Sequence, residues 1–173
     1  MSVGAPSFRE RLVFDEARGE ILDESRRYML IRPEALMGIF RRLAPAQQAE
    51  ALQAFAQSIV EQGSDSARAY QKLGASDAAA LLDAIAATAP QLGWGIWSFE
   101  RPTDDMIRLA VRNSPFAAGY GRSDTPVCHA IVGMMQATST LAFGRAGTAT
   151  EVQCAATGAP HCLFEARPSD SAP

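Results

Sequence analysis

Short runs of alternating apolar and polar residues open the chain. Residues 11–24 show two such runs on either side of residues 17–19, and this pattern predicts a β-hairpin that turns at the glycine. Residues 27–33 form a third apolar run and are a third strand candidate. Residues 1–10 lack either pattern, and we expect them to be disordered.

Helical spacing then replaces strand alternation. Apolar residues recur every three or four positions after Pro33, Pro45 and Ser76, so each segment predicts a helix with one buried face. Ser76 is the N-cap candidate of the third helix. We expect a break in the second helix at residues 63–64 and an end to the third at Pro90. The apolar positions are Leu36, Met37, Phe40, Leu43, Leu52, Phe55, Ala56, Ile59, Val60, Leu81, Leu82 and Ile85.

Strand alternation returns in the second half of the chain. Residues 93–102 and 106–113 alternate apolar and polar side chains around a polar turn, which predicts an antiparallel hairpin. Residues 114–124 read as an irregular segment. A long apolar helix is expected over residues 127–143, and two strands follow it before a disordered tail begins at residue 168.

These elements predict an α+β fold, in which an antiparallel sheet packs against several helices and an N-terminal hairpin precedes them. The chain has 173 residues, of which 47% are apolar and 20% charged, and this composition suits one domain over residues 11–167. A net charge of -3 gives no general attraction to nucleic acid or anionic lipid. We see no signal peptide or spanning segment and expect a cytoplasmic protein.

Four potential metal ligands follow one another in the last third of the chain. Cys128 stands at the start of the predicted long helix, and Glu151, Cys154 and Cys162 stand in the two final strands. If the helix start meets the strand pair, three thiolates and a carboxylate could fill a tetrahedral zinc shell. A shell completed by protein ligands leaves no position for water, so such a zinc would be structural rather than catalytic.

An alternative interpretation is that the cysteines are small buried hydrophobic residues. The spacing is not that of a zinc ribbon, since no Cys-x-x-Cys is present. Glu151 and Cys154 are three residues apart, and such residues point to opposite faces of a regular strand. They could share a metal only through a bulge or a strand end, and no chain breaker lies between them.

No catalytic motif supports an enzyme, and we assign no catalytic residue. The chain has no phosphate loop, no dinucleotide fingerprint and no Ser-His-Asp pattern. The two histidines, His129 and His161, each adjoin a cysteine. Each could support a metal site, act as a general acid, or have a structural role alone.

A group of large apolar residues suggests either a core or a ligand cavity. We expect the cavity between the hairpin of residues 93–112 and the helix that starts near Val127, where small residues such as Gly133 and Ala137 could leave volume unfilled. Periodicity cannot separate a filled core from a hollow one. The candidate ligand-binding residues are Trp97, Phe99, Ile107, Leu109, Val111, Phe116, Tyr120, Met134 and Met135.

The sequence resembles the 4-vinyl reductase domain family, also called the hydrocarbon-binding domain family. The resemblance rests on SDTPVCHAIVGMMQATSTLAFGR (residues 123–145), TEVQCAATGAPHCLFEA (150–166) and RYMLIRPEALMGIFRRL (27–43). It implies a mixed α/β domain that pairs as a homodimer. The order of cysteine, glutamate, cysteine and cysteine is similar to the zinc site of phenol-responsive activators in the same superfamily, which implies zinc at Cys128, Glu151, Cys154 and Cys162.

The resemblance implies a function in binding a small hydrophobic or aromatic molecule, as a stand-alone sensor or carrier. Phenol sensors place a histidine and a tryptophan in their pocket, whereas residues 77–85 and 109–116 here contain neither, which argues against a ligand with a phenol-type hydroxyl. One alternative is an accessory subunit or enzyme of vinyl-group reduction in bacteriochlorophyll biosynthesis. A second is a dimeric assembly scaffold with a filled core. The resemblance also implies a bacterial protein.

Overall fold

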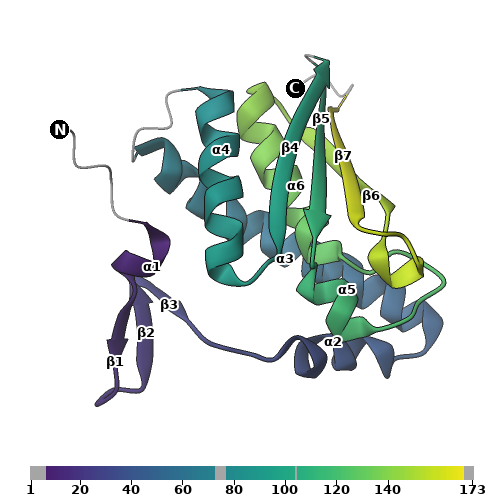
Figure 1. Cartoon of the computed structure of the whole chain (residues 1–173), viewed down its shortest axis with the longest axis horizontal. Helices are drawn as coiled ribbons and strands as arrows, with labels where there is room; N and C mark the ends of the chain where they lie inside the picture. Colours follow the sequence, from purple (N-terminus) through teal and green to yellow (C-terminus); the bar gives the residue numbers. More distant parts are fainter. Residues whose placement is uncertain (1–6, 73–76, 104, 170–173) are drawn as a thin grey trace.

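The computed structural model describes residues 7–72, 77–103 and 105–169, and the side chains of these residues except 64–72, 101 and 102. The expectations for Ser76, for residues 1–6 and for residues 170–173 lie outside this range. Two antiparallel sheets and the helices between them make up a mixed α/β fold, as the sequence predicted (Figure 1). No helix in the described ranges combines the length and the apolar character needed to cross a membrane.

A small N-terminal sheet lies beside the main body and joins it through an extended strap, residues 29–32 (Figure 1). The third strand ends at Tyr28, not at residue 33. Tyr28 pairs with Ile21, which is the second residue of the short second strand. Residues after Tyr28 therefore have almost no backbone partners on that strand. Residues 7–10 are also ordered, since Phe8 is buried. The elements of this unit are α1 (Phe8–Arg11), β1 (Val13–Asp15), β2 (Glu20–Asp23) and β3 (Arg26–Tyr28).

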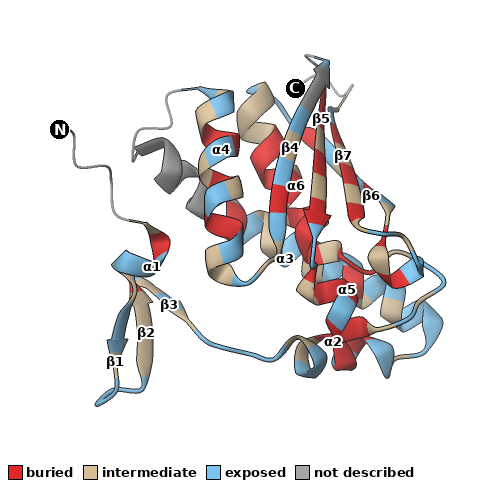
Figure 2. Ribbon diagram, viewed as in Figure 1, coloured by how far each residue is buried: buried red, intermediate tan, exposed pale blue. Residues whose placement is uncertain are grey.

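The main sheet has four antiparallel strands in the order β4-β5-β7-β6. One face is buried and the other faces solvent, as the alternation predicted (Figure 2). Pro168 belongs to the last strand, and the Ser169 N–H donates to the Ala146 carbonyl, so the chain stays ordered past the predicted start of the tail. The strands are β4 (Ile96–Thr103), β5 (Met106–Arg112), β6 (Gly147–Gln153) and β7 (Cys162–Pro168).

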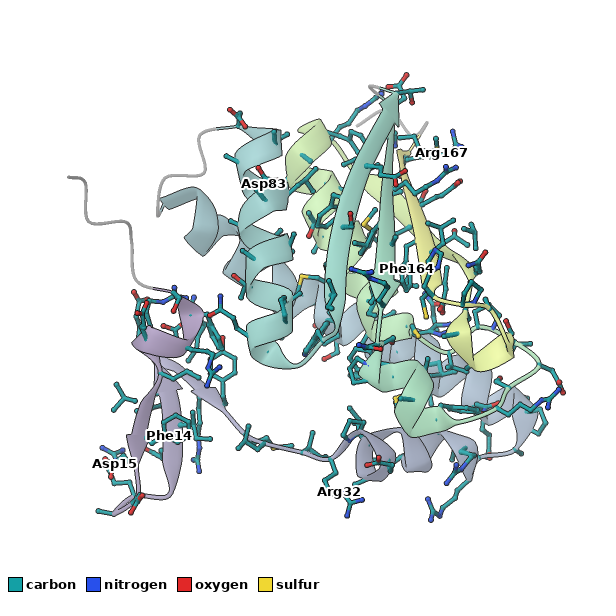
Figure 3. All side chains as sticks on the ribbon, viewed as in Figure 1. Phe14, Asp15, Arg32, Asp83, Phe164 and Arg167 are labelled. Carbon is teal, nitrogen blue, oxygen red and sulfur yellow. The ribbon has the colours of Figure 1, made fainter. Side chains whose placement is uncertain are left out.

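Helices cover the buried face of this sheet. α6 packs against β6 and β7, α4 packs against β4, and α3 packs on the far side of α6. Phe164 on β7 is fully buried between these layers (Figure 3). The helices are α2 (Pro33–Arg41), α3 (Pro45–Lys72), α4 (Ala78–Thr88), α5 (Pro115–Tyr120) and α6 (His129–Phe143), with short 3-10 turns η1 (Ala89–Leu92) and η2 (Ala155–Thr157).

The predicted break in α3 at residues 63–64 is wrong, because α3 continues to Lys72. Gly63 is buried against α6, where a Cβ built on it would lie 3.3 Å from the Met134 Cε and 3.6 Å from the Ala137 Cβ. The glycine therefore serves close helix packing rather than a turn. Tertiary packing outweighs its weak helix propensity.

Two other local expectations also need correction. The irregular segment after β5 contains α5, because Ser114 caps the Ala117 N–H and Pro115 occupies the first helical turn. α4 is capped by Asp77, whose side chain accepts a hydrogen bond from the Ala80 N–H. α4 ends at Thr88, and η1 carries Pro90 beyond it.

Candidate functional site

The four predicted metal ligands meet at one buried place. One ligand atom from each of Cys128, Glu151, Cys154 and Cys162 lies within 4.8 Å of the others. Cys128 is the N-cap of α6, Cys162 begins β7, and Glu151 and Cys154 lie on and just after β6. The exposed fraction is 0% for each cysteine and 7% for the glutamate. The cluster therefore joins the start of one helix to the ends of two strands.

A bulge brings Glu151 and Cys154 to the same side. Glu151 pairs with Phe164, and Gln153 pairs with Leu163. These residues are two positions apart on β6 but only one position apart on β7, so β6 contains one extra residue. β6 then ends, and Cys154 starts the turn η2. Glu151 and Cys154 would point to opposite faces of a regular strand, but the bulge and the strand end let both face the cluster.

The geometry of the cluster fits a metal ion. The Cys128 Sγ lies 3.9 Å from the Cys154 Sγ and 3.7 Å from the Cys162 Sγ. Two thiolates on a tetrahedral zinc, each at about 2.3 Å, are separated by about 3.8 Å. The Glu151 Oε2 accepts the Cys128 N–H at 2.8 Å, whereas its Oε1 is buried without a partner among the described residues. A buried orphan oxygen beside three sulfurs is a donor set that a cation would complete.

Without a cation, the four groups cannot all ionise. Burial raises the pKa of Glu151 to about 8. Hydrogen bonds with the Cys154 and Cys162 thiols raise the pKa of Cys128, while the same kind of bond from Cys128 lowers the pKa of Cys154. A divalent ion would compensate these negative charges and let the thiolates and carboxylate coexist.

Neither histidine belongs to the group of ligand atoms. His129 begins α6 directly after Cys128, and burial lowers its pKa. Its Nδ1 is buried with no partner among the described residues. The His161 carbonyl accepts a hydrogen bond from the Gln153 side chain, which braces the turn between Cys154 and Cys162. Their roles in supporting a metal or a proton transfer stay predictions.

A second feature is a cavity of about 310 Å³ between the N-terminal sheet and the helices. The N-terminal unit forms one wall, α3 and Met134 of α6 form another, and the end of α4 with η1 and the two tryptophans completes it. The lining residues are Phe8, Leu12, Phe14, Ile21, Tyr28, Met29, Leu30, Ile59, Gln62, Gly63, Ile85, Thr88, Ala89, Gln91, Leu92, Trp94, Trp97 and Met134.

The cavity includes two of the nine predicted ligand-binding residues, Trp97 and Met134. The other seven do not line it. Most of them lie in the packed core between sheet and helices, so the cavity extends away from the predicted place, toward the N-terminal sheet. Whether any of these nine residues binds a ligand stays a prediction. The seven are Phe99, Ile107, Leu109, Val111, Phe116, Tyr120 and Met135.

The small residues of α6 do not leave the volume that the sequence suggested. A Cβ on Gly133 would lie 2.2 Å from the Ala56 carbonyl oxygen of α3, and Ala137 contacts Gly63. Backbone of α3 therefore fills this space. Sequence reasoning missed the lining residues from α1 to β3. Phe14, Met29 and Leu30 gave the only signal, since they are apolar residues in segments too short to bury them.

The part of the cavity wall that the structure describes is mostly apolar and carries no charged side chain. None of the described lining residues is acidic, basic or a histidine. The Thr88 hydroxyl donates to the Ala84 carbonyl, and the Gln91 side chain donates to the Ala87 carbonyl and accepts the Arg9 N–H. The Trp97 Nε1 donates to the Trp94 carbonyl. Aromatic rings and aliphatic groups thus dominate the surface that a guest would meet.

Comparison with known proteins found a family-model match over part of the chain and solved structures of similar fold. Residues 107–168 match the family model of the 4-vinyl reductase domain. The phenol-responsive sensory domain of the transcription activator PoxR, solved with phenol, has a similar structure with a TM-score of 0.79 and 18% identity, over 92% of this chain and 86% of that one. A comparison with curated protein sequences found no match.

Two further solved structures are similar. A trafficking protein particle complex subunit 3 from Naegleria fowleri, covalently bound to palmitic acid, has a TM-score of 0.58 and 9% identity, over 82% of this chain and 97% of that one. A vinyl-4-reductase family protein from Methanocaldococcus jannaschii has a TM-score of 0.47 and 17% identity, over 80% of this chain and 91% of that one. As the resemblance predicted, this chain carries a match to the 4-vinyl reductase domain over residues 107–168, within a fold similar to that of a phenol-responsive sensory domain.

Proposed function

We propose that this protein binds one small hydrophobic or aromatic molecule in the cavity and acts as a sensor or carrier. The observation that carries the proposal is a cavity of about 310 Å³ whose described lining residues are uncharged and mostly aromatic or aliphatic. This volume is at the lower end of the range of about 300–1,000 Å³ typical of small-molecule pockets. Apolar burial at about 25 cal/mol per Å² would supply most of the affinity.

The similarity of fold to a phenol-responsive sensory domain supports a sensing role. The family match over residues 107–168 supports it as well. The trafficking subunit with covalently bound palmitic acid is a second protein of similar fold that holds an apolar molecule.

We propose that zinc binds at Cys128, Glu151, Cys154 and Cys162. All four ligands would come from the protein, so the metal would lack an open position for water and would stabilise the fold. The ion would tie the start of α6 to the ends of β6 and β7. Because α6 also carries Met134, the metal would hold one wall of the cavity in place.

A thermal-shift measurement tests the ligand proposal. Naphthalene and other apolar compounds should raise the melting temperature, because a ligand that binds only the folded state stabilises it. NADPH alone should not raise it. Ala89 is buried and lines the cavity, whereas Ala87 is exposed and does not. Ala89→Phe should therefore abolish the naphthalene shift, and Ala87→Phe should keep it.

Two results would reject the proposal. If no apolar compound in a broad panel shifts the melting temperature, the chain does not act by binding such molecules, and the scaffold interpretation takes its place. A shift by NADPH alone would favour the enzymatic alternative. Native mass spectrometry of the purified protein would report any retained ligand at the same time.

A further inference from the structure

The cavity has a buried end and an exposed end. Ile85, Ala89 and Trp97 are 5%, 4% and 6% exposed and form the inner end. Met29 and Leu30 of the strap are 75% and 85% exposed although they line the same cavity. A guest would therefore enter past the strap, with its most apolar part toward the inner end.

Gln62 lies among the exposed lining residues and keeps its hydrogen-bonding capacity. Its side chain makes no hydrogen bond with any other described side chain or backbone group. Thr88 and Gln91, in contrast, are bonded to backbone groups. An amide offers two donors and an acceptor, so Gln62 can bind a hydroxyl or a carbonyl equally well.

We propose that Gln62 is a specificity-determining residue, which selects an uncharged ligand with one hydroxyl or carbonyl group at its outer end. This inference rests on the proposed function of the cavity. The ligand places its apolar body against Trp97 and Ile85 and its polar group beside the Gln62 amide. The polar group thus lies at the mouth beside Gln62, whereas the sequence argument against a phenol-type hydroxyl concerned the missing histidine and tryptophan of residues 77–85 and 109–116.

The charge of the wall supports an uncharged ligand. An ionised carboxylate loses hydration on entry and needs a cation or several donors to compensate. The described lining residues include no arginine, lysine or histidine. Gln62 alone would compensate a hydroxyl but not a full negative charge.

The volume fits a molecule of about two fused rings. An apolar cavity of about 150 Å³ accommodates one benzene. The cavity here is about 310 Å³, roughly twice as large. Naphthalene, 2-naphthol and 2-naphthoate are therefore suitable probes, since they share one ring system and differ only in a missing, a neutral or an ionised polar group.

Calorimetric titration of these three probes at neutral pH tests the inference, with the wild type, Gln62→Leu and Gln53→Leu. Gln53 is an exposed glutamine of α3 that does not line the cavity, so it provides a matched control. In the wild type, 2-naphthoate should bind at least about tenfold more weakly than 2-naphthol. Gln62→Leu should lower the affinity ratio of 2-naphthol to naphthalene by roughly 3- to 10-fold, the effect of one neutral hydrogen bond. Gln53→Leu should leave the ratio unchanged.

Three results would overturn the inference. The affinity ratio of 2-naphthol to naphthalene could be the same in Gln62→Leu and the wild type, which would show that Gln62 does not bind the polar group. Equal binding of 2-naphthoate and 2-naphthol by the wild type would reject an uncharged ligand. Failure of all three probes to bind the wild type would reject the proposed function itself, and the inference with it.

Discussion

Val152 lies at the bulge that helps to bring Cys128, Glu151, Cys154 and Cys162 together. The extra residue in β6 lets Glu151 and Cys154 face one place, and Val152 itself is 50% exposed. The four residues of the cluster could be predicted from the sequence, because cysteine and glutamate are residue types that bind zinc, and the structure brings them together. The bulge could not, since it depends on how β6 pairs with β7 and no glycine or proline marks it.

The first prediction concerns Cys154 and Cys162. Replacing either residue by serine should reduce the zinc content from about one per chain to near zero. It should also lower the melting temperature by about 6–12 °C if the loss is about 3 kcal/mol, because metal binding energy contributes to folding energy. Metal analysis and calorimetry would measure the two effects.

Ser139 provides a control for this prediction, since it is buried but lies outside the cluster. Ser139→Ala should keep the full zinc content. The metal proposal would be wrong if wild-type protein purified without chelator were free of metal and as stable as protein reconstituted with zinc.

At the scale of elements, the packing of α6 on α3 depends on Gly133. A Cβ there would lie 2.2 Å from the Ala56 carbonyl oxygen, which belongs to backbone and cannot move aside. The periodicity of apolar residues predicted α6 and the first part of α3, but not the continuation of α3 past Gly63. It could not show that Gly133 and Gly63 serve helix contact, because a small residue in a sequence is compatible with a cavity, a turn or a close approach.

The second prediction compares these two glycines. Gly133→Ala should destabilise the protein by about 1–3 kcal/mol, the usual cost of overpacking. Gly63→Ala should cost much less, because its Cβ would meet the flexible end of Met134 and alanine has the better helix propensity. Urea denaturation would measure both. Equal effects of the two substitutions would contradict the packing described here.

At the scale of the whole molecule, the cavity joins segments that are far apart in the sequence. Phe8 to Leu30, α3, α4, η1 and Met134 each supply part of its wall. The sequence predicted the elements and their order, and the cavity in the structure includes Trp97 and Met134 of the predicted site but extends toward the N-terminal sheet. The position of the N-terminal sheet relative to the helices is set by tertiary contacts, such as the hydrogen bond from the Arg9 N–H to Gln91, that local patterns do not reveal.

The third prediction is a homodimer. Met29, Leu30, Ile31 and Ile39 are 75%, 85%, 46% and 57% exposed, and exposed apolar side chains that are close in the sequence suit a pairing surface. Light scattering at micromolar concentration should give about twice the chain mass of 18.5 kDa. Ile39→Glu should shift the protein toward the monomer, because a charge would be buried at the interface.

Val152 is a matched control for the dimer, since it is exposed and apolar but lies on β6. Val152→Glu should leave the dimer intact. A wild-type protein that stays monomeric at micromolar concentration would exclude this form of assembly.

The most direct test of the central claim uses tryptophan fluorescence. The chain contains two tryptophans, Trp94 and Trp97, and both line the cavity. Titration with naphthalene should change their emission and saturate at one molecule per chain with micromolar affinity, and Ala89→Phe should remove this change. An emission that stays constant, or that changes without saturation in wild type and variant alike, would contradict a ligand site in the cavity.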